Sequence, residues 1–258
     1  MHDLHTHSNY SDGKFLFRMV RAAERAGLDG IGFTDHCNVS PRAGAKDARA
    51  ARGFNLDRTY ERRRRAIDQL REESEIAIYD AVEMDYDSRD EAEIRAFLSA
   101  ADFDYTIGSV HDVMGTNVQV ASAFEDKSTD ECTTVVDRYF DQLVALIESE
   151  LFDIAAHADL LERTPPLRGY ATETHYYRVA EAFADSRTIP EINVGRTLSD
   201  EILHPGRTFI EILREHDVPF TIGSDSHRPD EVTARADILE DVLWEYDIEP
   251  VTSFIPNR

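Results

Sequence analysis

Seven short apolar segments alternate with helical patterns along the chain, and this alternation constrains the fold more than any other feature. Segments rich in Ile, Val, Phe or Ala predict strands near 2–6, 30–34, 76–82, 104–110, 152–156, 188–193 and 219–224. Helical patterns follow near 14–27, 58–74, 89–101, 131–150, 172–186, 206–216 and 231–245. Repeated strand–helix units indicate parallel strands with right-handed crossovers. We therefore expect one α/β domain over residues 1–258, a barrel of seven units that is distorted or incompletely closed.

Residues of metal-binding type come directly after the apolar residues of most of these predicted strands. A histidine in such a buried position is costly unless a metal ion or a hydrogen bond holds it. The carboxyl ends of parallel strands meet at one edge, where α/β proteins build their sites, so these residues should converge. The candidate metal ligands are His5, His7, Asp12, His36, Glu83, His111, His157, Asp225 and His227.

The spacing within two of these motifs supports a shared site. His5 and His7 are two residues apart, so in a strand both imidazoles point to the same face. Asp225 and His227 repeat this spacing at the last predicted strand. A barrel brings its first and last strands together, and the two pairs should therefore meet.

The ligand types indicate the metal and the chemistry. Imidazole and carboxylate together suit Zn²⁺, Mn²⁺ or Fe²⁺. Nine candidates are too many for one tetrahedral ion and suit two or three ions that share a bridging carboxylate. Such centres activate water and clamp phosphoryl oxygens, so we expect hydrolysis of a small phosphate ester. The chain contains neither a P-loop nor a Gly-x-Ser-x-Gly motif, which argues against a kinase or a serine hydrolase.

The charge of the chain limits its partners. The formal net charge is −23, and the only lysines are Lys14, Lys46 and Lys127. An acid-rich, lysine-poor surface is typical of halophilic proteins, in which salt screens the self-repulsion; a merely acidic mesophilic protein is the alternative. This charge repels nucleic acid. Without a long apolar run or room for a signal peptide, we expect a cytoplasmic protein with no membrane segment. The oligomeric state stays open.

Three further features receive structural interpretations. Residues 39–56 are polar and contain Pro41, Gly44 and Gly53, so they predict a mobile loop beside the site. The basic run 62–65 is interpreted as a solvated helix face that pairs with acids, in preference to a nucleic-acid contact. Cys37 and Cys132 are too few for a disulfide framework, and Cys37 is interpreted as a small buried residue rather than a metal ligand.

The motifs also resemble the PHP (polymerase and histidinol phosphatase) superfamily over essentially the whole chain. The residues that carry the resemblance are His5-Thr6-His7-Ser8, Ser11-Asp12-Gly13, Gly32-Phe33-Thr34-Asp35-His36, Glu83, Gly108-Ser109-Val110-His111, Ala156-His157-Ala158-Asp159 and Gly223-Ser224-Asp225-Ser226-His227-Arg228-Pro229. The resemblance implies a distorted, TIM-like (βα)7 barrel with up to three divalent metal ions at the C-terminal face of its strands.

The resemblance also implies how the ligands are shared among the metals. The first set is His5, His7, Glu83 and Asp225; the second is Glu83, as a bridge, with His111 and His157; the third is Asp12, His36 and His227. Many members carry histidine where this chain has Asp12, so the third site should prefer a harder ion or bind more weakly.

The stand-alone histidinol phosphatases are the most similar branch, through motifs such as Glu191-Ile192-Asn193 and His204-Pro205. This implies hydrolysis of L-histidinol phosphate, with Glu83, Asp225 and His227 at the catalytic centre. Arg163 and Arg196 are candidate phosphate ligands, although each could instead pair with surface acids. Residues 112–115 and 39–56 depart from that branch and would shape the alcohol pocket, so two alternatives stay open. One is a hydrolase of nucleotides or nucleic-acid ends, and the other is a non-catalytic metal-binding module.

The remaining histidines are predicted to lie outside the ligand set, because none closes an apolar strand beside an acid; they are His2, His175, His204 and His216. Arg228 is a weaker candidate for phosphate binding. Asp35 and Asp112 adjoin candidate ligands and are expected to orient them or to cap local structure.

Overall fold

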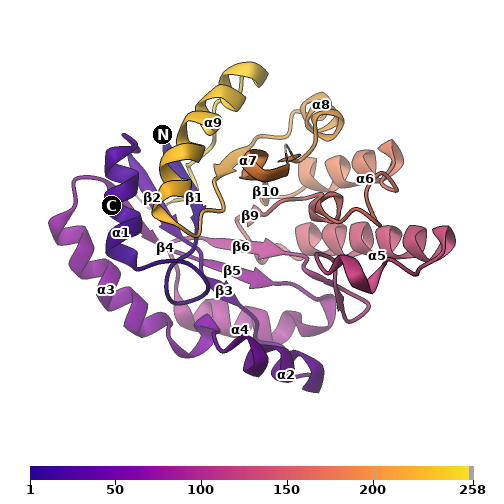
Figure 1. Ribbon diagram of the computed structural model, residues 1–258, viewed down its shortest axis with the longest axis horizontal. Coiled ribbons are helices and arrows are strands. Elements are labelled where there is room, and N and C mark those ends of the chain that lie inside the picture. Colours follow the sequence, from indigo (N-terminus) through magenta and orange to yellow (C-terminus); the bar gives the residue numbers. More distant parts are fainter. Residues whose placement is uncertain (201, 256–258) are drawn as a thin grey trace.

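The computed structural model describes residues 1–200 and 202–255 and shows a mixed α/β fold, with strands at the centre and helices around them (Figure 1). The strands are β1 His2–Thr6, β2 Gly30–Phe33, β3 His36–Cys37, β4 Ala77–Asp80, β5 Val82–Asp85, β6 Thr106–Ser109, β7 Asp112–Val113, β8 Thr116–Asn117, β9 Ile154–Ala155, β10 Ile189–Arg196, β11 Ile202–His204 and β12 Thr221–Gly223. The helices are α1 Leu16–Arg25, α2 Ala43–Arg52, α3 Tyr60–Glu73, α4 Glu91–Ala101, α5 Thr129–Glu148, α6 Glu173–Ala184, α7 Thr197–Asp200, α8 Arg207–Glu215 and α9 Pro229–Tyr246, with 3₁₀ turns η1 Leu56–Arg58, η2 Ser88–Asp90, η3 Ala121–Ala123 and η4 Leu160–Arg163.

The central strands form two mainly parallel sheets. One has the order β1-β2-β4, and the other has the order β11-β10-β9-β6-β5-β3, with β12 parallel to β10. Backbone hydrogen bonds connect the first and last strands, since Asp225 N donates to His5 O at 2.8 Å and His7 N donates to Ser226 O at 2.9 Å. The parallel strands expected from the sequence are thus present. Closure into one seven-stranded barrel, and a single domain over residues 1–258, remain predictions.

Every predicted strand region overlaps at least one observed strand, and every predicted helical pattern overlaps a helix. The main differences are lengths and breaks. The predicted strand 76–82 lies partly in β4 and partly in β5, which are separated at Ala81. Helix α5 begins with a capping box in which Ser128 and Glu131 satisfy each other's backbone N–H groups, so its start is fixed by local chemistry.

The apolar side chains of the strands and helices pack together into the hydrophobic core. A cluster of Leu4, Tyr105, Ile107 and Ile154, each at most 1% exposed, joins residues of β1, β6 and β9 with the residue before β6. Side chains far apart in sequence thereby hold the strand ends in fixed positions. Within the described residues, no helix combines the length and apolarity that crossing a membrane would require.

The prediction of a mobile loop at 39–56 is wrong in part, because ten of these residues form α2. None of the α2 side chains is buried. The helix is instead attached by polar contacts: Arg49 Nη1 donates to Asn38 Oδ1 at 2.9 Å, and Arg52 lies 3.6 Å from Asp85. An Ala-rich segment forms a helix by intrinsic propensity, which hydrophobic periodicity does not detect.

The interpretation of residues 62–65 as a solvated face is also wrong for one of them. Arg63 is fully buried and lies between two buried carboxylates, at 2.9 Å from Asp35 and 2.7 Å from Asp80. Asp80 also accepts a bond from Arg64 at 2.7 Å. The run therefore connects α3 to β4 and to the segment after β2, which is a structural role inside the protein.

Candidate metal centre

The nine candidate ligands come from six of the central strands or their ends and from the loop after β1. His5 lies in β1, with His7 just beyond it, and His36 and Glu83 pair directly in the register of β3 and β5. The others follow the carboxyl ends of their strands: His111 after β6, His157 after β9, and Asp225 and His227 after β12. The parallel arrangement thus brings together residues that are more than 200 positions apart.

One carboxylate oxygen of Glu83 faces three histidines. Its Oε2 atom is 3.6 Å from Nε2 of His5, 3.6 Å from Nε2 of His7 and 2.6 Å from Nδ1 of His36. This oxygen is buried and accepts no hydrogen bond. A buried carboxylate oxygen without a hydrogen bond is costly, and a divalent cation shared with these rings would satisfy it. The residues present therefore fit a metal centre.

The other oxygen of Glu83 faces a second group. Oε1 is 3.5 Å from Nε2 of His111 and 3.1 Å from Nε2 of His157, and it accepts a hydrogen bond from Ser109 Oγ at 2.5 Å. Glu83 therefore lies between two sets of imidazoles, as a bridging carboxylate would.

Three groups have ligand atoms that all lie within 4.8 Å of one another: His5, His7 and Asp225; His36, Glu83 and His111; and His7, Asp12, His36 and His227. The first group contains three members of the first implied metal set, and the fourth member, Glu83, lies 3.6 Å from both His5 and His7. The second group contains His36, whereas the resemblance assigned His157; His157 contacts Glu83 but is outside the group. Each position predicted from the sequence is thus at the cluster.

Hydrogen bonds fix the tautomers of three candidate ligand rings. His5 Nδ1 lies 2.8 Å from the buried carboxylate of Glu191, and His111 Nδ1 lies 2.6 Å from Asp85. A carboxylate acceptor places the proton on Nδ1, which leaves the Nε2 lone pair of each ring directed at the cluster. His227 follows the same rule, because its Nδ1 donates to a backbone carbonyl, that of Asp225, at 2.9 Å.

The backbone is strained at two candidate ligands. His157 has φ of 30° and Asp225 has φ of 52°, in the left-handed region that costs non-glycine residues about 1–3 kcal/mol. Close approach also restricts Gly223, where an added Cβ would overlap Glu191 and His5. The chain thus retains unfavourable local geometry where it directs side chains into the cluster.

Burial differs across the cluster. The side chains of His5 and His7 are fully buried, whereas those of Asp12 and His227 are 42% and 31% exposed. The distance between Asp12 Oδ1 and His227 Nε2 is 3.3 Å. The group that contains Asp12 therefore opens to solvent, and an ion held there would exchange more readily than one held by His5 and His7.

Without a cation, the cluster balances its own charges. Burial lowers the pKa of His7 and of His157 to about 4, so both rings are neutral. Burial also opposes charge on His36, but Glu83 and Asp12 raise the pKa of this ring to about 9. Burial likewise opposes charge on Glu83, but His36 and the other rings hold the pKa of this carboxyl well below its usual range. A proton on His36 thus occupies the place of a cation, and metal binding would release it.

A cavity of about 480 Å³ opens onto this cluster, and arginines line it. Arg163 Nη2 donates to Asn193 Oδ1 at 3.2 Å and to Asp225 Oδ2 at 3.3 Å. Arg196, at the end of β10, also lines the cavity and is exposed. Arg228 lines it too, but this side chain pairs with Asp230 at 3.2 Å. Arg163 and Arg196, the two candidate phosphate ligands, thus both line the cavity beside the cluster.

Several contributors were not predicted. Asp85 and Glu191 orient ligand rings, as described above, and Arg235 donates to the backbone carbonyls of Asp225 and Gly195 at 2.9 and 2.7 Å. Asp35 does not contact His36; it accepts bonds from Ser8, Ser11 and Arg63 and so holds the loop after β1. Asp85, rather than the adjacent Asp112, contacts the ring of His111; Asp112 was expected either to orient this ring or to cap local structure.

The remaining histidines contact other parts of the protein. His2 lies 3.2 Å from Tyr79 Oη, and His175 lies 2.9 Å from Asp137. His216 Nδ1 lies 2.9 Å from the carbonyl oxygen of Ile212. His204 contacts Asp159 and Arg163 and so belongs to the surroundings of the cavity rather than to the ligand cluster.

Comparison with known proteins identifies the family of this chain. A model of the PHP domain matches residues 3–195, and the chain belongs to the PHP domain family. A histidinol phosphate phosphatase from Lactococcus lactis, whose structure is a complex with zinc, L-histidinol and phosphate, is similar in fold, with a TM-score of 0.81, 20% identity and coverage of 98% of this chain and 96% of that chain.

Two other solved structures share the fold. A candidate histidinol phosphatase from Listeria monocytogenes has a TM-score of 0.71 and 18% identity, with coverage of 90% of this chain and 97% of that chain. A chain of an archaeal ribonuclease P with mature tRNA has a TM-score of 0.51 and 11% identity, with coverage of 100% and 97%. Among curated protein sequences, none matches this chain.

Proposed function

We propose that the protein is a metal-dependent phosphoric monoester hydrolase and that its substrate is L-histidinol phosphate. The observation that carries the proposal is the position of Glu83. Its two buried oxygens face separate sets of histidines beneath a cavity that Arg163 and Arg196 line. A bridging carboxylate for two cations, beside cationic groups for an anion, is the arrangement that phosphoryl hydrolysis requires.

Two or three divalent ions, of zinc, manganese or iron, would be held by the nine ligands. His5, His7 and Asp225 would hold one, His111 and His157 would hold another with Glu83 between them, and Asp12, His36 and His227 would hold a third. When bound, such ions supply a nucleophile at neutral pH and neutralise the charge of phosphoryl oxygens.

The protein's own residues would do the rest. Arg163 and Arg196 would bind the nonbridging oxygens of the phosphate, because a guanidinium offers paired donors to such oxygens. Glu191 and Asp85 would keep the rings of His5 and His111 in one tautomer. The cavity volume of about 480 Å³ lies within the range of small-molecule sites, so the alcohol would be enclosed next to the phosphate.

The choice of L-histidinol phosphate rests on two supports. The motifs resemble the stand-alone histidinol phosphatases, and the fold is similar to that of a phosphatase whose structure contains L-histidinol and phosphate. The net charge of −23 disfavours nucleic acid as a substrate. A 5′-nucleotide is the remaining small competitor, because the centre would accept its phosphate equally well.

The test is phosphate release from L-histidinol phosphate, a 5′-nucleotide and an aryl phosphate, with Mn²⁺ or Zn²⁺ added, in molar and in dilute KCl. We expect kcat/KM for L-histidinol phosphate of at least ~10⁴ M⁻¹s⁻¹, far above the other two. Comparable slow rates on all three would retain the phosphatase and reject this substrate. No hydrolysis of any ester by the metal-loaded protein would favour a non-catalytic metal-binding module.

A further inference from the structure

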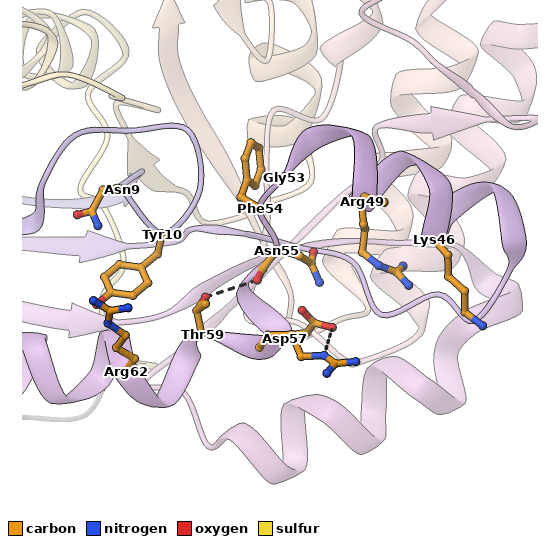
Figure 2. Close-up of a pocket in the computed structure, with 12 residues that line it drawn as sticks. Asn9, Tyr10, Lys46, Arg49, Gly53, Phe54, Asn55, Asp57, Thr59 and Arg62 are labelled. Carbon is orange, nitrogen blue, oxygen red and sulfur yellow. Dashed lines mark hydrogen bonds and ion pairs between the residues drawn. The ribbon is translucent and has the colours of Figure 1, made fainter.

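A second cavity, of about 730 Å³, lies beside the metal centre in the part of the molecule built by α2 and α3 (Figure 2). The loop after β1 and the first turn of α3 form one wall, and the last turns of α2 and the segment through η1 form the other. The lining residues are Asn9, Tyr10, Lys46, Arg49, Ala50, Gly53, Phe54, Asn55, Asp57, Arg58, Thr59 and Arg62. We call this cavity the α2–α3 cleft.

The charge of the α2–α3 cleft opposes that of the chain. Its lining residues include Lys46, Arg49, Arg58 and Arg62, against a single acid, Asp57. In the chain as a whole, 51 acidic residues outnumber 28 basic ones. A concave surface that gathers cations on an acidic protein produces a local positive potential, and such a potential attracts anions.

Of the four cations of the cleft, only Arg58 makes an ion pair within the described residues, with Asp57 at 3.7 Å. Arg49 donates from Nη1 to Asn38 Oδ1 and to the Ser40 carbonyl oxygen, both at 2.9 Å, and these acceptors are uncharged. Neither Lys46 nor Arg62 makes an ion pair within residues 1–200 and 202–255. Their charges are therefore available to a ligand.

Arginines nearby show the contrast. Arg42, just before α2, contacts Asp87 at 2.7 Å and Asp90 at 2.6 Å, and Arg71, near the end of α3, contacts Asp104 at 2.6 Å. Carboxylates are thus abundant around these helices. The cleft itself, by contrast, has one carboxylate among its lining residues, that of Asp57.

The cleft also offers apolar contact and touches the metal centre. Tyr10 and Arg62 lie on one side of it and Arg49 and Lys46 on the other (Figure 2). The ring of Phe54 lines the cleft and stacks on His36, with 6.2 Å between centroids and 21° between planes. Carbon atoms of a ligand could therefore pack against rings while its charged oxygens reach the cations.

We propose that the α2–α3 cleft is a binding site for a multiply charged organic anion, separate from the metal centre. Lys46, Arg49 and Arg62 attract its phosphate, carboxylate or sulfonate groups, and Tyr10 and Phe54 contact its carbon skeleton. This site does not depend on the substrate of the metal centre. It would exist equally in a phosphatase of another specificity.

Fluorescence anisotropy of pyrenetetrasulfonate, added to the metal-loaded protein in dilute KCl, tests the proposal. This probe combines fused rings with four sulfonates and has no phosphate to hydrolyse. Each exposed cation should contribute modestly, so Lys46→Gln and Arg62→Gln should each raise Kd about threefold, and the double variant about tenfold. Circular dichroism would establish that each variant is folded.

Two matched variants separate this site from others. Arg25→Gln removes an exposed arginine on α1, away from the cleft, that makes no ion pair in the described part of the chain, and Arg228→Gln removes an exposed arginine of the metal-centre cavity that pairs with Asp230. Both should leave Kd unchanged. The proposal is overturned if the double variant binds the probe as well as the wild type does, or if Arg25→Gln or Arg228→Gln weakens binding as much as the double variant.

Discussion

Arg163 Nε donates a hydrogen bond to Nε2 of the buried His204 at 2.9 Å. The other hydrogen bonds of this guanidinium, in the part of the chain described, go to Asn193 and Asp225. His204 Nδ1 lies 2.5 Å from Asp159, which places the ring proton on Nδ1 and leaves Nε2 free to accept. Asp159 and His204 therefore act as positioning residues that aim Arg163 at the cavity.

Two substitutions of His204 should show whether this residue positions Arg163 or only supports folding. His204→Met keeps most of the volume but removes the acceptor for Arg163, whereas His204→Gln keeps both an acceptor and a donor. We expect His204→Met to lose about 10- to 100-fold in kcat/KM and to weaken inhibition by inorganic phosphate, because Arg163 loses a buried partner. His204→Gln should stay within about threefold. Equal activity of both variants, at unchanged metal content, would show that Arg163 is held by other contacts.

The same histidine should make stability depend on pH. Burial lowers the pKa of His204 below its usual 6.5, so the unfolded chain binds this proton more readily than the folded protein does. The stability contribution is therefore complete above about pH 6.5 and falls as the pH drops toward the folded-state pKa. We expect the free energy of unfolding of the wild type, relative to His204→Gln, to decrease from about pH 7.5 to about pH 5.5 in urea titrations. A constant difference would show that His204 titrates normally.

Glu83→Gln should remove metal as well as activity. The substitution preserves the size of the side chain but takes away the negative charge between the two sets of histidines. We expect the bound metal to fall by at least one ion per chain and kcat by about a thousandfold or more. Asp12→Asn is the control, since it changes the solvent-exposed group and should cost one ion only. Full metal content and activity in Glu83→Gln would contradict a bridging role.

Arg63→Met should destabilise the fold strongly. It leaves Asp35 and Asp80 buried without their cation, and breaking a buried pair on one side costs about 3–5 kcal/mol. Arg65→Met, two positions along the same helix but exposed, should change the free energy of unfolding by no more than about 0.5 kcal/mol. Denaturant titrations of the two variants would measure the difference, and similar values for both would reject the structural role of Arg63.

The spacing of polar residues predicted which side chains lie together in the cluster and could have predicted more of its surroundings. The two-residue spacing that drew attention to His5 and His7 also relates Glu83 to Asp85. In each strand, alternate residues face the same side, so the second residue of such a pair lies near the first. Glu191 and Asn193 follow the same rule, and they contact His5 and Arg163. We applied the two-residue spacing only to the pairs that contain histidine, although the pairs of Glu83 with Asp85 and of Glu191 with Asn193 have the same spacing.

Other features could not be read from local pattern. Helix α2 has no buried face, so its apolar periodicity is absent and only its alanine content favours a helix. Arg63 is one of four consecutive arginines, and its burial depends on Asp35 and Asp80, which lie on other elements. Tertiary packing determines which carboxylates pair with a given arginine, and a single sequence does not show that packing.

The pairing of β1 with the segment after β12 has a consequence for the synthesis of the protein. His5 and Asp225 are 3.9 Å apart at their ligand atoms, yet more than 200 residues separate them along the chain, so His5 is synthesised well before Asp225. An emerging chain can display most of the histidines but cannot complete the cluster until the last strand has left the ribosome. Loading of a cation at His5, His7 and Asp225 would thus be a late event, and a chain interrupted before residue 225 would offer a metal only incomplete sites.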